Sequence, residues 1–351
     1  MDFKEIFAYR LKTARKIAGL SMDALVEKMH KVVTKSAIGK YESGKMLPGS
    51  TNLSDIAKAL NISVDYFFRP VNYKFSEIEF RKKSSLPQKA QKKIEAESLD
   101  YAERYLELEN ILNKRIIFKN PISEVEIKSG EDIENIVTEL RNKWNSGNGP
   151  ISNLLSLLEE KGFIIYESDE PDNFDGMSAK IDGIPFIYIN KKTDNLRKRF
   201  TALHEVAHLI LKFPSSNSHS QNEKLCHYFA GAFLIPEDVI KNELGIKRSR
   251  LLLKELINIK ETYGISVQAL VSRANKLNII SDNYYKQICI YFRKNHMQKE
   301  NGLGKYNGIE NTTRFENMIS YAVSEQIISL SKGASLTGKS LAEFRKELYK
   351  E

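Results

Sequence analysis

The sequence predicts an α+β multidomain protein with helices at both ends and a small antiparallel sheet in the middle. The chain has 351 residues, more than a single hydrophobic core usually serves. Short apolar stretches at 163–166, 179–181 and 184–189 indicate strands, and Asp182-Gly183 between the last two favours a tight hairpin turn. Helical spacing of apolar residues dominates residues 3–70 and the chain from residue 198 onward.

Changes in composition divide the chain into four regions. Residues 81–93 are polar, contain Pro87 and indicate a linker that opens a helix, whose charged, leucine-spaced pattern continues to residue 113. Residues 146–150 are a Gly- and Pro-containing break, followed by an amphipathic helix over 151–161 that Gly162 would cap. We therefore expect an all-α domain over 1–70, a helical linker over 71–145, an α+β domain over 146–283 and a helical C-terminal region over 284–351.

The charge of the chain is concentrated in its first fifth. The net charge is +9, and residues 1–70 hold 12 basic and 7 acidic side chains, more than half of the excess. Such a segment is typical of a separate nucleic-acid-binding module. Two cysteines cannot form a disulfide framework, and no apolar run is long enough to span a bilayer. These features exclude secreted, collagenous and integral-membrane classes, and we expect a cytoplasmic protein.

The N-terminal region is expected to form five short helices. Ser21 and Thr34 stand where N-caps of the second and third helices belong, Ser50 or Thr51 would cap the fourth, and Ser63 a last turn. A brief connection joins the second and third helices. That arrangement is helix-turn-helix geometry, in which the second of the two helices can lie in the major groove of DNA.

In this segment the chain resembles the Xre family of helix-turn-helix DNA-binding domains. The matching residues are Leu11, Arg15, Gly19, Leu20, Ser21, Leu25, Ile38, Tyr41, Glu42, Ser43, Gly44, Pro48, Leu53, Ile56, Ala57, Leu60, Asn61, Ile62, Ser63, Asp65 and Phe67. The resemblance implies a double-stranded DNA operator as partner. It also implies that four residues of the third helix face base edges and that Thr34 contacts a phosphate; the four are Lys35, Ser36, Gly39 and Lys40.

Two further features refine this interpretation. By the same resemblance, Arg15 and Glu42 would form a partly buried ion pair that stabilises the fold. The family often has Gln after the Ser21-type cap, where it contacts DNA, but this chain has Met22. The operator preference therefore differs from that of relatives with Gln. The alternative is a helix-turn-helix fold reused for protein contacts only.

Four of the six histidines lie within a window of 24 residues, and two of them belong to a metal-binding motif. His204-Glu205-Val206-Ala207-His208 has the form His-Glu-x-x-His within an apolar helical run. Residues four apart share one helix face, so both imidazoles can bind one zinc ion. Glu205 would then act as general base towards a water that zinc activates. Unpaired His and Glu on a largely buried helix would otherwise be costly.

A third zinc ligand is needed, and the sequence offers several. The metzincin pattern would require Gly and His at positions 211 and 214, where the chain has Leu211 and Pro214. A following helix over 223–236 places Glu223 in its first turn. His219 and His227 compete with Glu223, but two histidines and one carboxylate form a gluzincin-like set that suits hydrolytic zinc.

This part of the chain resembles the ImmA/IrrE family of zinc metallopeptidases, which are zincin-like. The shared motifs are Ile-Tyr-Ile-Asn at 187–190, Arg-Phe-Thr at 199–201 leading into the histidine motif, Glu223 followed by Phe-Ala at 229–230, and Leu-Ile-Pro at 234–236. The similarity covers about residues 151–281 and is weaker over 327–348.

The resemblance implies roles for individual residues. His204, His208 and Glu223 would bind Zn²⁺, and Glu205 would be the catalytic base. The strand over 184–189 would be an edge to which an extended substrate peptide adds. His227 stands where relatives commonly have Asn and could orient a zinc-bound histidine.

Several residues near the motif have less specific roles. Tyr188, His219 and Arg199 are within sequence reach as oxyanion stabilisers, and the sequence does not choose among them. Cys226 is expected to be a packed small residue, and Trp144 to pack the helix that precedes the break at 146–150.

Two functions remain open from the sequence. The first is a DNA-binding transcriptional regulator with a zinc-dependent endopeptidase domain, which cleaves a repressor or antitoxin-like protein and binds DNA as a homodimer. The alternative is a non-hydrolytic DNA-binding regulator or antitoxin whose zinc domain senses a ligand or partner.

Overall fold

The structure is a computed structural model that describes residues 2–71, 78–80, 87–171, 174–297, 300 and 302–349. The chain divides into two compact units. Unit 1 comprises residues 1–115, 181–183 and 313–351, and unit 2 comprises residues 116–180 and 184–312. The predicted linker over 71–145 is thus shared between the units, and so is the predicted region over 284–351. Residues 81–86 of the expected polar linker lie outside the described residues.

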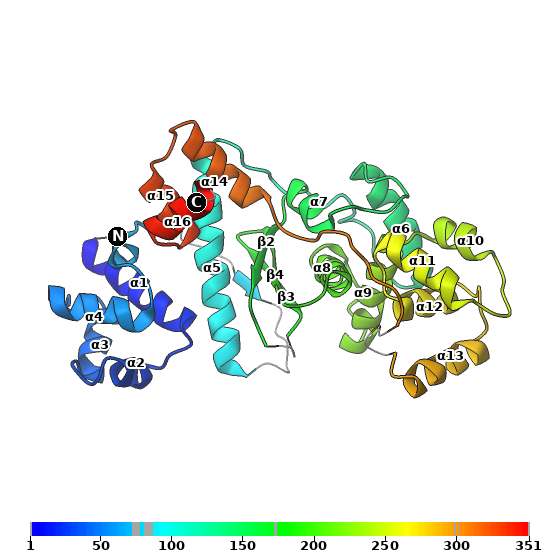
Figure 1. Cartoon of the computed structure of the whole chain (residues 1–351), viewed down its shortest axis with the longest axis horizontal. Coiled ribbons are helices and arrows are strands. Elements are labelled where there is room, and N and C mark those ends of the chain that lie inside the picture. The colour runs from blue at the N-terminus through cyan, green and yellow to red at the C-terminus, as the bar shows by residue number, and fades with distance from the viewer. Residues whose placement is uncertain are drawn as a thin grey trace. The chain divides into compact units, whose positions relative to one another are not determined.

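Unit 1 contains the N-terminal helices, one long helix and the three C-terminal helices (Figure 1). Its elements are α1 (Phe3–Ile17), α2 (Met22–Lys28), α3 (Lys35–Glu42), α4 (Ser50–Leu60), the 3-10 helix η1 (Val64–Phe68), β1 (Ile78–Phe80), α5 (Gln88–Ile111), α14 (Arg314–Ser324), α15 (Leu330–Thr337) and α16 (Leu341–Tyr349).

The first 70 residues form the expected five short helices around a core of their own. Buried side chains such as Phe7 and Leu11 of α1, Ile38 of α3 and Phe67 of η1 belong to one cluster. Ser21 and Thr34 cap α2 and α3 as predicted, each accepting a hydrogen bond from the backbone three residues on. The prediction for α4 was wrong: its N-cap is Gly49, and no side chain caps it.

The long helix α5 joins the N-terminal helices to the C-terminal ones within unit 1. Helix α1 packs against α5, and so do α14 and α15, although these two follow α5 by about 200 residues in the chain. Figure 1 shows the cyan helix α5 with the blue N-terminal helices and the orange and red C-terminal helices beside it. Unit 1 is therefore built from both ends of the chain.

Unit 2 has one hydrophobic core, which extends from Ile122 to Leu303 and includes Trp144 at the end of α6. Trp144 packs edge-on against Phe163 and Phe233, as its predicted packing role requires. The elements of unit 2 are α6 (Gly130–Lys143), α7 (Leu154–Glu160), β2 (Ile164–Ser168), β3 (Gly176–Ile181), β4 (Ile184–Asn190), α8 (Asn195–Ile210), α9 (His219–Leu234), α10 (Glu237–Leu244), α11 (Leu253–Tyr263), α12 (Val267–Lys276) and α13 (Asp282–Lys294).

The sheet of unit 2 is mixed, not purely antiparallel as the sequence predicted. Its strand order is β3-β4-β2, and β2 pairs with β4 in parallel register, with Ile165 opposite Ile187. The turn between β3 and β4 is the predicted one, with φ of 49° at Asp182 and 77° at Gly183. Since β4 enters between β3 and β2, it is an internal strand. The expectation that residues 184–189 form a free edge for a substrate peptide was therefore wrong.

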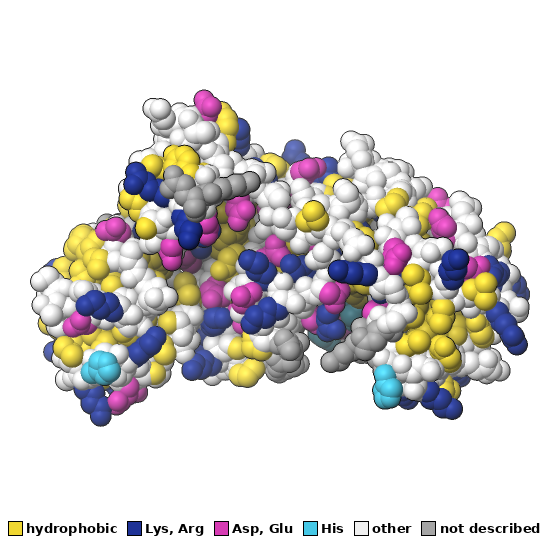
Figure 2. Space-filling model, in the orientation of Figure 1, with side chains coloured by type: hydrophobic (Ala, Val, Ile, Leu, Met, Phe, Trp, Pro, Cys, Tyr) yellow, Lys and Arg dark blue, Asp and Glu magenta, His cyan; other side chains and the backbone are white. Residues whose placement is uncertain are grey.

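The surface carries charges of both signs. Figure 2 shows Lys and Arg side chains spread over the visible face of the molecule, with Asp and Glu among them. None of the helices in the described ranges combines the length and apolar character needed to cross a membrane.

Candidate functional site: a metal centre and a nucleic-acid interface

The histidine motif lies on α8, a helix buried on nearly all sides. Asp194 caps this helix by accepting a hydrogen bond from the Arg197 amide, and all residues from Thr201 to Ile210 are buried. Apolar neighbours such as Leu203 and Val206 anchor α8 in the core of unit 2. His204 and His208 are each 9% exposed and lie one turn apart, so their rings occupy the same face of the helix.

Helix α9 packs against α8 and brings Glu223 to the two imidazoles. Glu223 Oε2 is 3.3 Å from His204 Nε2, its Oε1 is 3.0 Å from His208 Nε2, and the two Nε2 atoms are 3.1 Å apart. Because α9 begins at His219, Glu223 lies one turn further into the helix than predicted.

These three side chains form a group that could hold a metal ion. The ligand atoms of His204, His208 and Glu223 all lie within 4.8 Å of one another. Two imidazole nitrogens and one carboxylate oxygen are the donor types of a catalytic zinc site with one position left open. The donor set therefore fits the metal that the sequence predicted.

Glu205 lies beside this group, next to strand β3. Its side chain is buried, and its Oε2 accepts a hydrogen bond of 2.7 Å from the Ser178 hydroxyl. Strand β3 runs very close to α8: a Cβ atom at Gly176 would lie 2.7 Å from Thr201 Cγ2 and 2.9 Å from the Tyr188 carbonyl oxygen. Glycine at 176 and serine at 178 thus allow the strand to reach the glutamate. The sequence analysis did not identify Ser178, because a serine in a strand has no distinctive spacing.

Two more residues of α9 contact the histidines. Cys226 is buried, as expected of a packed residue, but its Sγ is also 3.3 Å from His208 Nδ1, a contact that the sequence analysis missed. The ring of His227 stacks on that of Phe200, with centroids 5.8 Å apart, and its centroid is 4.3 Å from that of His204. The periodicity of α9 could have identified Cys226, because it lies three residues after Glu223.

The three candidate oxyanion stabilisers have different surroundings. Tyr188 is buried and donates its hydroxyl hydrogen to Glu170. Arg199 is buried and bonds to Glu310 and to the carbonyl oxygens of residues 151, 263 and 264. His219 is exposed, and its Nε2 is 3.7 Å from Glu223 Oε1. His219 thus lies close to the metal group.

The second candidate site is the outer face of α3. Thr34, Lys35, Ser36 and Lys40 are exposed, and Gly39 is half-buried, while Ile38 and Tyr41 on the opposite side face the core. The Thr34 side chain already accepts the Ala37 amide as the helix cap. Lys35 forms an ion pair with Asp23 of α2 at 2.7 Å, with both side chains more than 60% exposed.

The predicted Arg15–Glu42 ion pair is confirmed. Arg15 Nε is 2.5 Å from Glu42 Oε1, and a second bond of 2.8 Å joins Nη2 to Oε2. Arg15 also donates to the Leu20 carbonyl oxygen, so the pair connects α1, the turn before α2 and the end of α3. This bidentate geometry holds α3 in place behind its exposed face.

Comparison with protein families identifies both domains. Residues 11–67 match a family model described as helix-turn-helix, and residues 161–275 match a peptidase family model described as IrrE N-terminal-like domain. No curated relative matches the chain. The resemblances derived from the sequence are thereby confirmed: one chain joins a helix-turn-helix domain to a metallopeptidase-like domain.

Proposed function

Because the chain joins these two domains, we propose that it is a DNA-binding transcriptional regulator and a zinc-dependent endopeptidase. The observation that carries the proposal is the convergence of His204, His208 and Glu223 beside the buried Glu205. A site kept only for stability or sensing has no need of a general base at that place. The substrate class that we propose is a repressor or antitoxin-like protein.

The chemistry follows from the positions of the side chains. His204, His208 and Glu223 would hold Zn²⁺, which supplies a Lewis acid that activates water for attack on a peptide carbonyl. Glu205 would accept the proton of the attacking water and pass it to the leaving amine. The hydrogen bond from Ser178 orients the Glu205 carboxylate for this transfer. Cys226 supports the ring of His208 from behind.

The DNA-binding half of the proposal depends on α3. Its exposed Lys35, Ser36 and Lys40 would enter the major groove, while Thr34 contacts a phosphate. Two copies of the chain would occupy the two halves of a palindromic operator. Homodimerisation is part of this proposal.

Metal analysis and a cleavage assay test the peptidase. Purified protein should contain one zinc ion per chain, and it should cleave a repressor encoded at the same locus. Glu205→Gln should retain the zinc but lose about 100- to 10,000-fold in kcat, because it removes the general base. The matched control is Glu160→Gln, an exposed glutamate of unit 2, which should cleave as wild type. Equal cleavage by wild type and Glu205→Gln contradicts the role of Glu205.

Operator binding tests the DNA-contacting helix. Lys35→Ala and Lys40→Ala should each weaken binding, and the salt slope should fall by about one unit in a variant whose lost contact is to a phosphate and not to a base edge. Lys58→Ala, an exposed lysine of α4, is the control in the same domain. Unchanged affinity and slope in both α3 variants would refute the docking of α3.

A further inference from the structure

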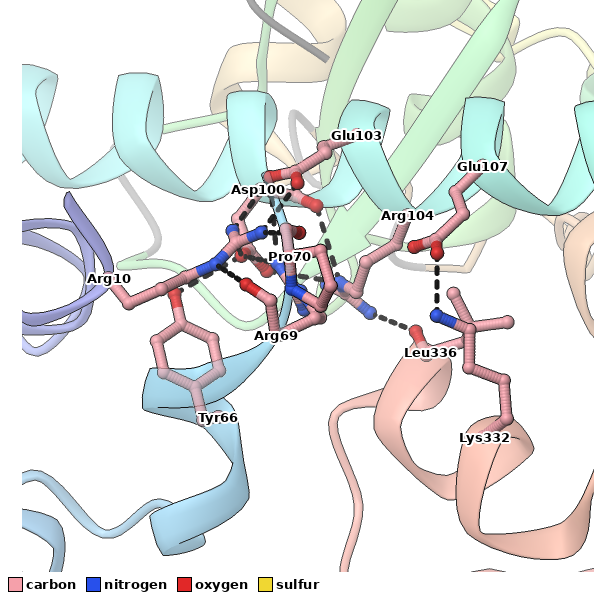
Figure 3. A network of polar contacts seen from close by, with 10 residues as sticks. All are labelled: Arg10, Tyr66, Arg69, Pro70, Asp100, Glu103, Arg104, Glu107, Lys332 and Leu336. Carbon is pink, nitrogen blue, oxygen red and sulfur yellow. Dashed lines mark hydrogen bonds and ion pairs between the residues drawn. The ribbon is translucent and has the colours of Figure 1, made fainter. Parts of the chain in front are cut away.

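Helix α5 is fixed to the DNA-binding domain by a buried network of charges (Figure 3). Arg10 of α1 is fully buried, and its guanidinium group donates two hydrogen bonds to Glu103 of α5, at 2.7 and 2.5 Å. The same group donates to the carbonyl oxygens of Arg69 and Pro70, where the chain leaves the domain. These hydrogen bonds all come from one planar guanidinium group, so they restrict the orientation of α5 relative to α1.

A second carboxylate extends this network along α5. Asp100 accepts hydrogen bonds from Arg69 and from the Tyr66 hydroxyl, which both belong to the DNA-binding domain. The other carboxylate oxygen of Asp100, Oδ2, accepts a hydrogen bond of 3.0 Å from Arg104. Arg104 also donates to the Leu336 carbonyl oxygen, and Lys332 pairs with Glu107, so α15, one of the C-terminal helices, contacts α5 further along the same helix.

The start of α5 carries exposed lysines, and this docking places them beside the turn that precedes α2. Lys89 and Lys92 are exposed, and a Cβ atom at Gly19 would lie 3.8 Å from Lys89 Cε. Lys12 and Lys16 are exposed on the neighbouring part of α1. Partial burial lowers the pKa of Lys16, and the positive charges of Lys12 and Lys92 lower it further, against the opposing charge of Glu95. The positive charges of Lys12, Lys16 and Lys92 thus repel one another around Lys16, and an anion bound there would relieve this repulsion.

The position of this cluster matches a phosphate backbone. In a helix-turn-helix domain the first helix of the motif crosses the DNA backbone while the second enters the groove. Here the first helix is α2, and the turn at Gly19 lies directly before its N-cap, Ser21. The residue after the cap is Met22, an apolar side chain that offers DNA no hydrogen bond or positive charge.

We propose that Lys89 and Lys92 of α5, with Lys12 and Lys16 of α1, form a second phosphate-binding patch for double-stranded DNA, which the Arg10–Glu103 network holds in place. The patch rests on the proposed DNA-binding function and adds to the contacts of α3. It supplies sequence-independent affinity next to α2. It also makes DNA binding depend on a helix outside the helix-turn-helix domain itself.

Salt-dependent binding of the full-length protein to a DNA duplex of random sequence tests the patch. In the double variant Lys89→Gln/Lys92→Gln, the plot of log affinity against log salt concentration should become shallower by about 1.8, or about 0.9 for each lost phosphate contact. The matched control is Lys254→Gln/Lys286→Gln, which removes two exposed lysines from unit 2 and should leave the slope unchanged. An unchanged slope in the first variant overturns the patch.

A third variant tests the network. Glu103→Gln keeps every lysine but weakens the two hydrogen bonds from Arg10. It should therefore make the plot of log affinity against log salt concentration shallower, as the lysine double variant does. Asp100→Asn should do likewise, and amide hydrogen exchange of α1 shows for each variant that the domain is folded. A folded variant with the wild-type slope overturns the role of the network.

If wild type itself does not bind the duplex, the proposed DNA-binding function and the patch fail together. If Lys35→Ala and Lys40→Ala weaken binding but the α5 variant does not, the patch alone fails.

Discussion

The metal group of unit 2 and the charge network of unit 1 are both buried polar clusters, but their charges are balanced in different ways. In the network, three guanidinium groups, those of Arg10, Arg69 and Arg104, face the carboxylates of Asp100 and Glu103. In the metal group, two imidazoles and one carboxylate bring their metal-ligand atoms within 4.8 Å of one another, and no cationic side chain is part of the group. The carboxylates of the first cluster are paired with arginines of the chain itself, whereas the donor atoms of the second could hold a metal cation.

The largest effect on stability is expected from Arg10→Ala. Removing this guanidinium leaves the buried carboxylates of Asp100 and Glu103 with less compensation, which should cost about 3–5 kcal/mol of unfolding free energy. The single tryptophan, Trp144, lies in unit 2 and reports that unit. Helix loss, followed by circular dichroism, should therefore begin at lower urea than in wild type, while the change in Trp144 fluorescence keeps its midpoint. If the circular dichroism and fluorescence transitions of Arg10→Ala coincide at the wild-type midpoint, Arg10 does not stabilise unit 1 as proposed.

Acid should weaken the network through Asp100. Burial by itself would raise the pKa of Asp100, but Arg104, Arg69 and Arg10 hold it at about 2, below the ordinary value of 3.8. A depressed pKa stabilises the fold above the unfolded value, and this contribution, about 2 kcal/mol, is lost as the pH falls from about 4 to 2. The difference in unfolding free energy between wild type and Asp100→Asn should shrink over this range. A difference that is independent of pH would refute this assignment.

Cys226 provides a smaller test, in the metal group. Cys226→Ala removes the contact with His208 Nδ1 and should weaken zinc binding by about 10- to 100-fold, as loss of an outer-shell partner commonly does. Cys226→Ser keeps a hydrogen-bonding atom there and should lose less. Competition with a zinc indicator measures all three proteins. Equal zinc affinity in all of them would show that Cys226 only fills space.

An exposed ion pair gives the smallest expected change and calibrates the others. Arg197 and Asp175 lie 2.6 Å apart, with the arginine side chain 59% exposed. Solvent screens such a pair, so Arg197→Ala should change the unfolding free energy by about 0–1 kcal/mol. A loss as large as that of Arg10→Ala would mean that burial is not what distinguishes the network.

The parts of the molecule that the sequence predicted well depend on short spacings. The caps at Ser21 and Thr34, the turn at Asp182-Gly183 and the His204–His208 pair all involve residues at most four positions apart. Helix and turn geometry bring such residues together whatever the rest of the chain does. Glu223 was predicted because α9 follows α8 directly and the family motif marks it.

The parts that the sequence did not predict depend on docking. Arg10 and Glu103 are 93 residues apart, and Arg104 and Leu336 are 232 apart. Nothing in the local pattern distinguishes these charged residues from those on a solvated face. The sheet was predicted as antiparallel for a similar reason: a hairpin is visible in the sequence, but the side on which β2 joins it is not.

The sequence by itself thus determined the two domains, the helix that carries the histidine motif and the residues that could bind zinc, because these follow from periodicity, from short spacings and from the family motifs. Only the tertiary structure decided that Ser178 and Cys226 contact the motif and that β4 is internal. It also decided that α5 and the C-terminal helices share a compact unit with the DNA-binding domain. Those arrangements depend on which buried charges and apolar faces satisfy one another across long stretches of chain, and that is settled only when the whole chain has folded.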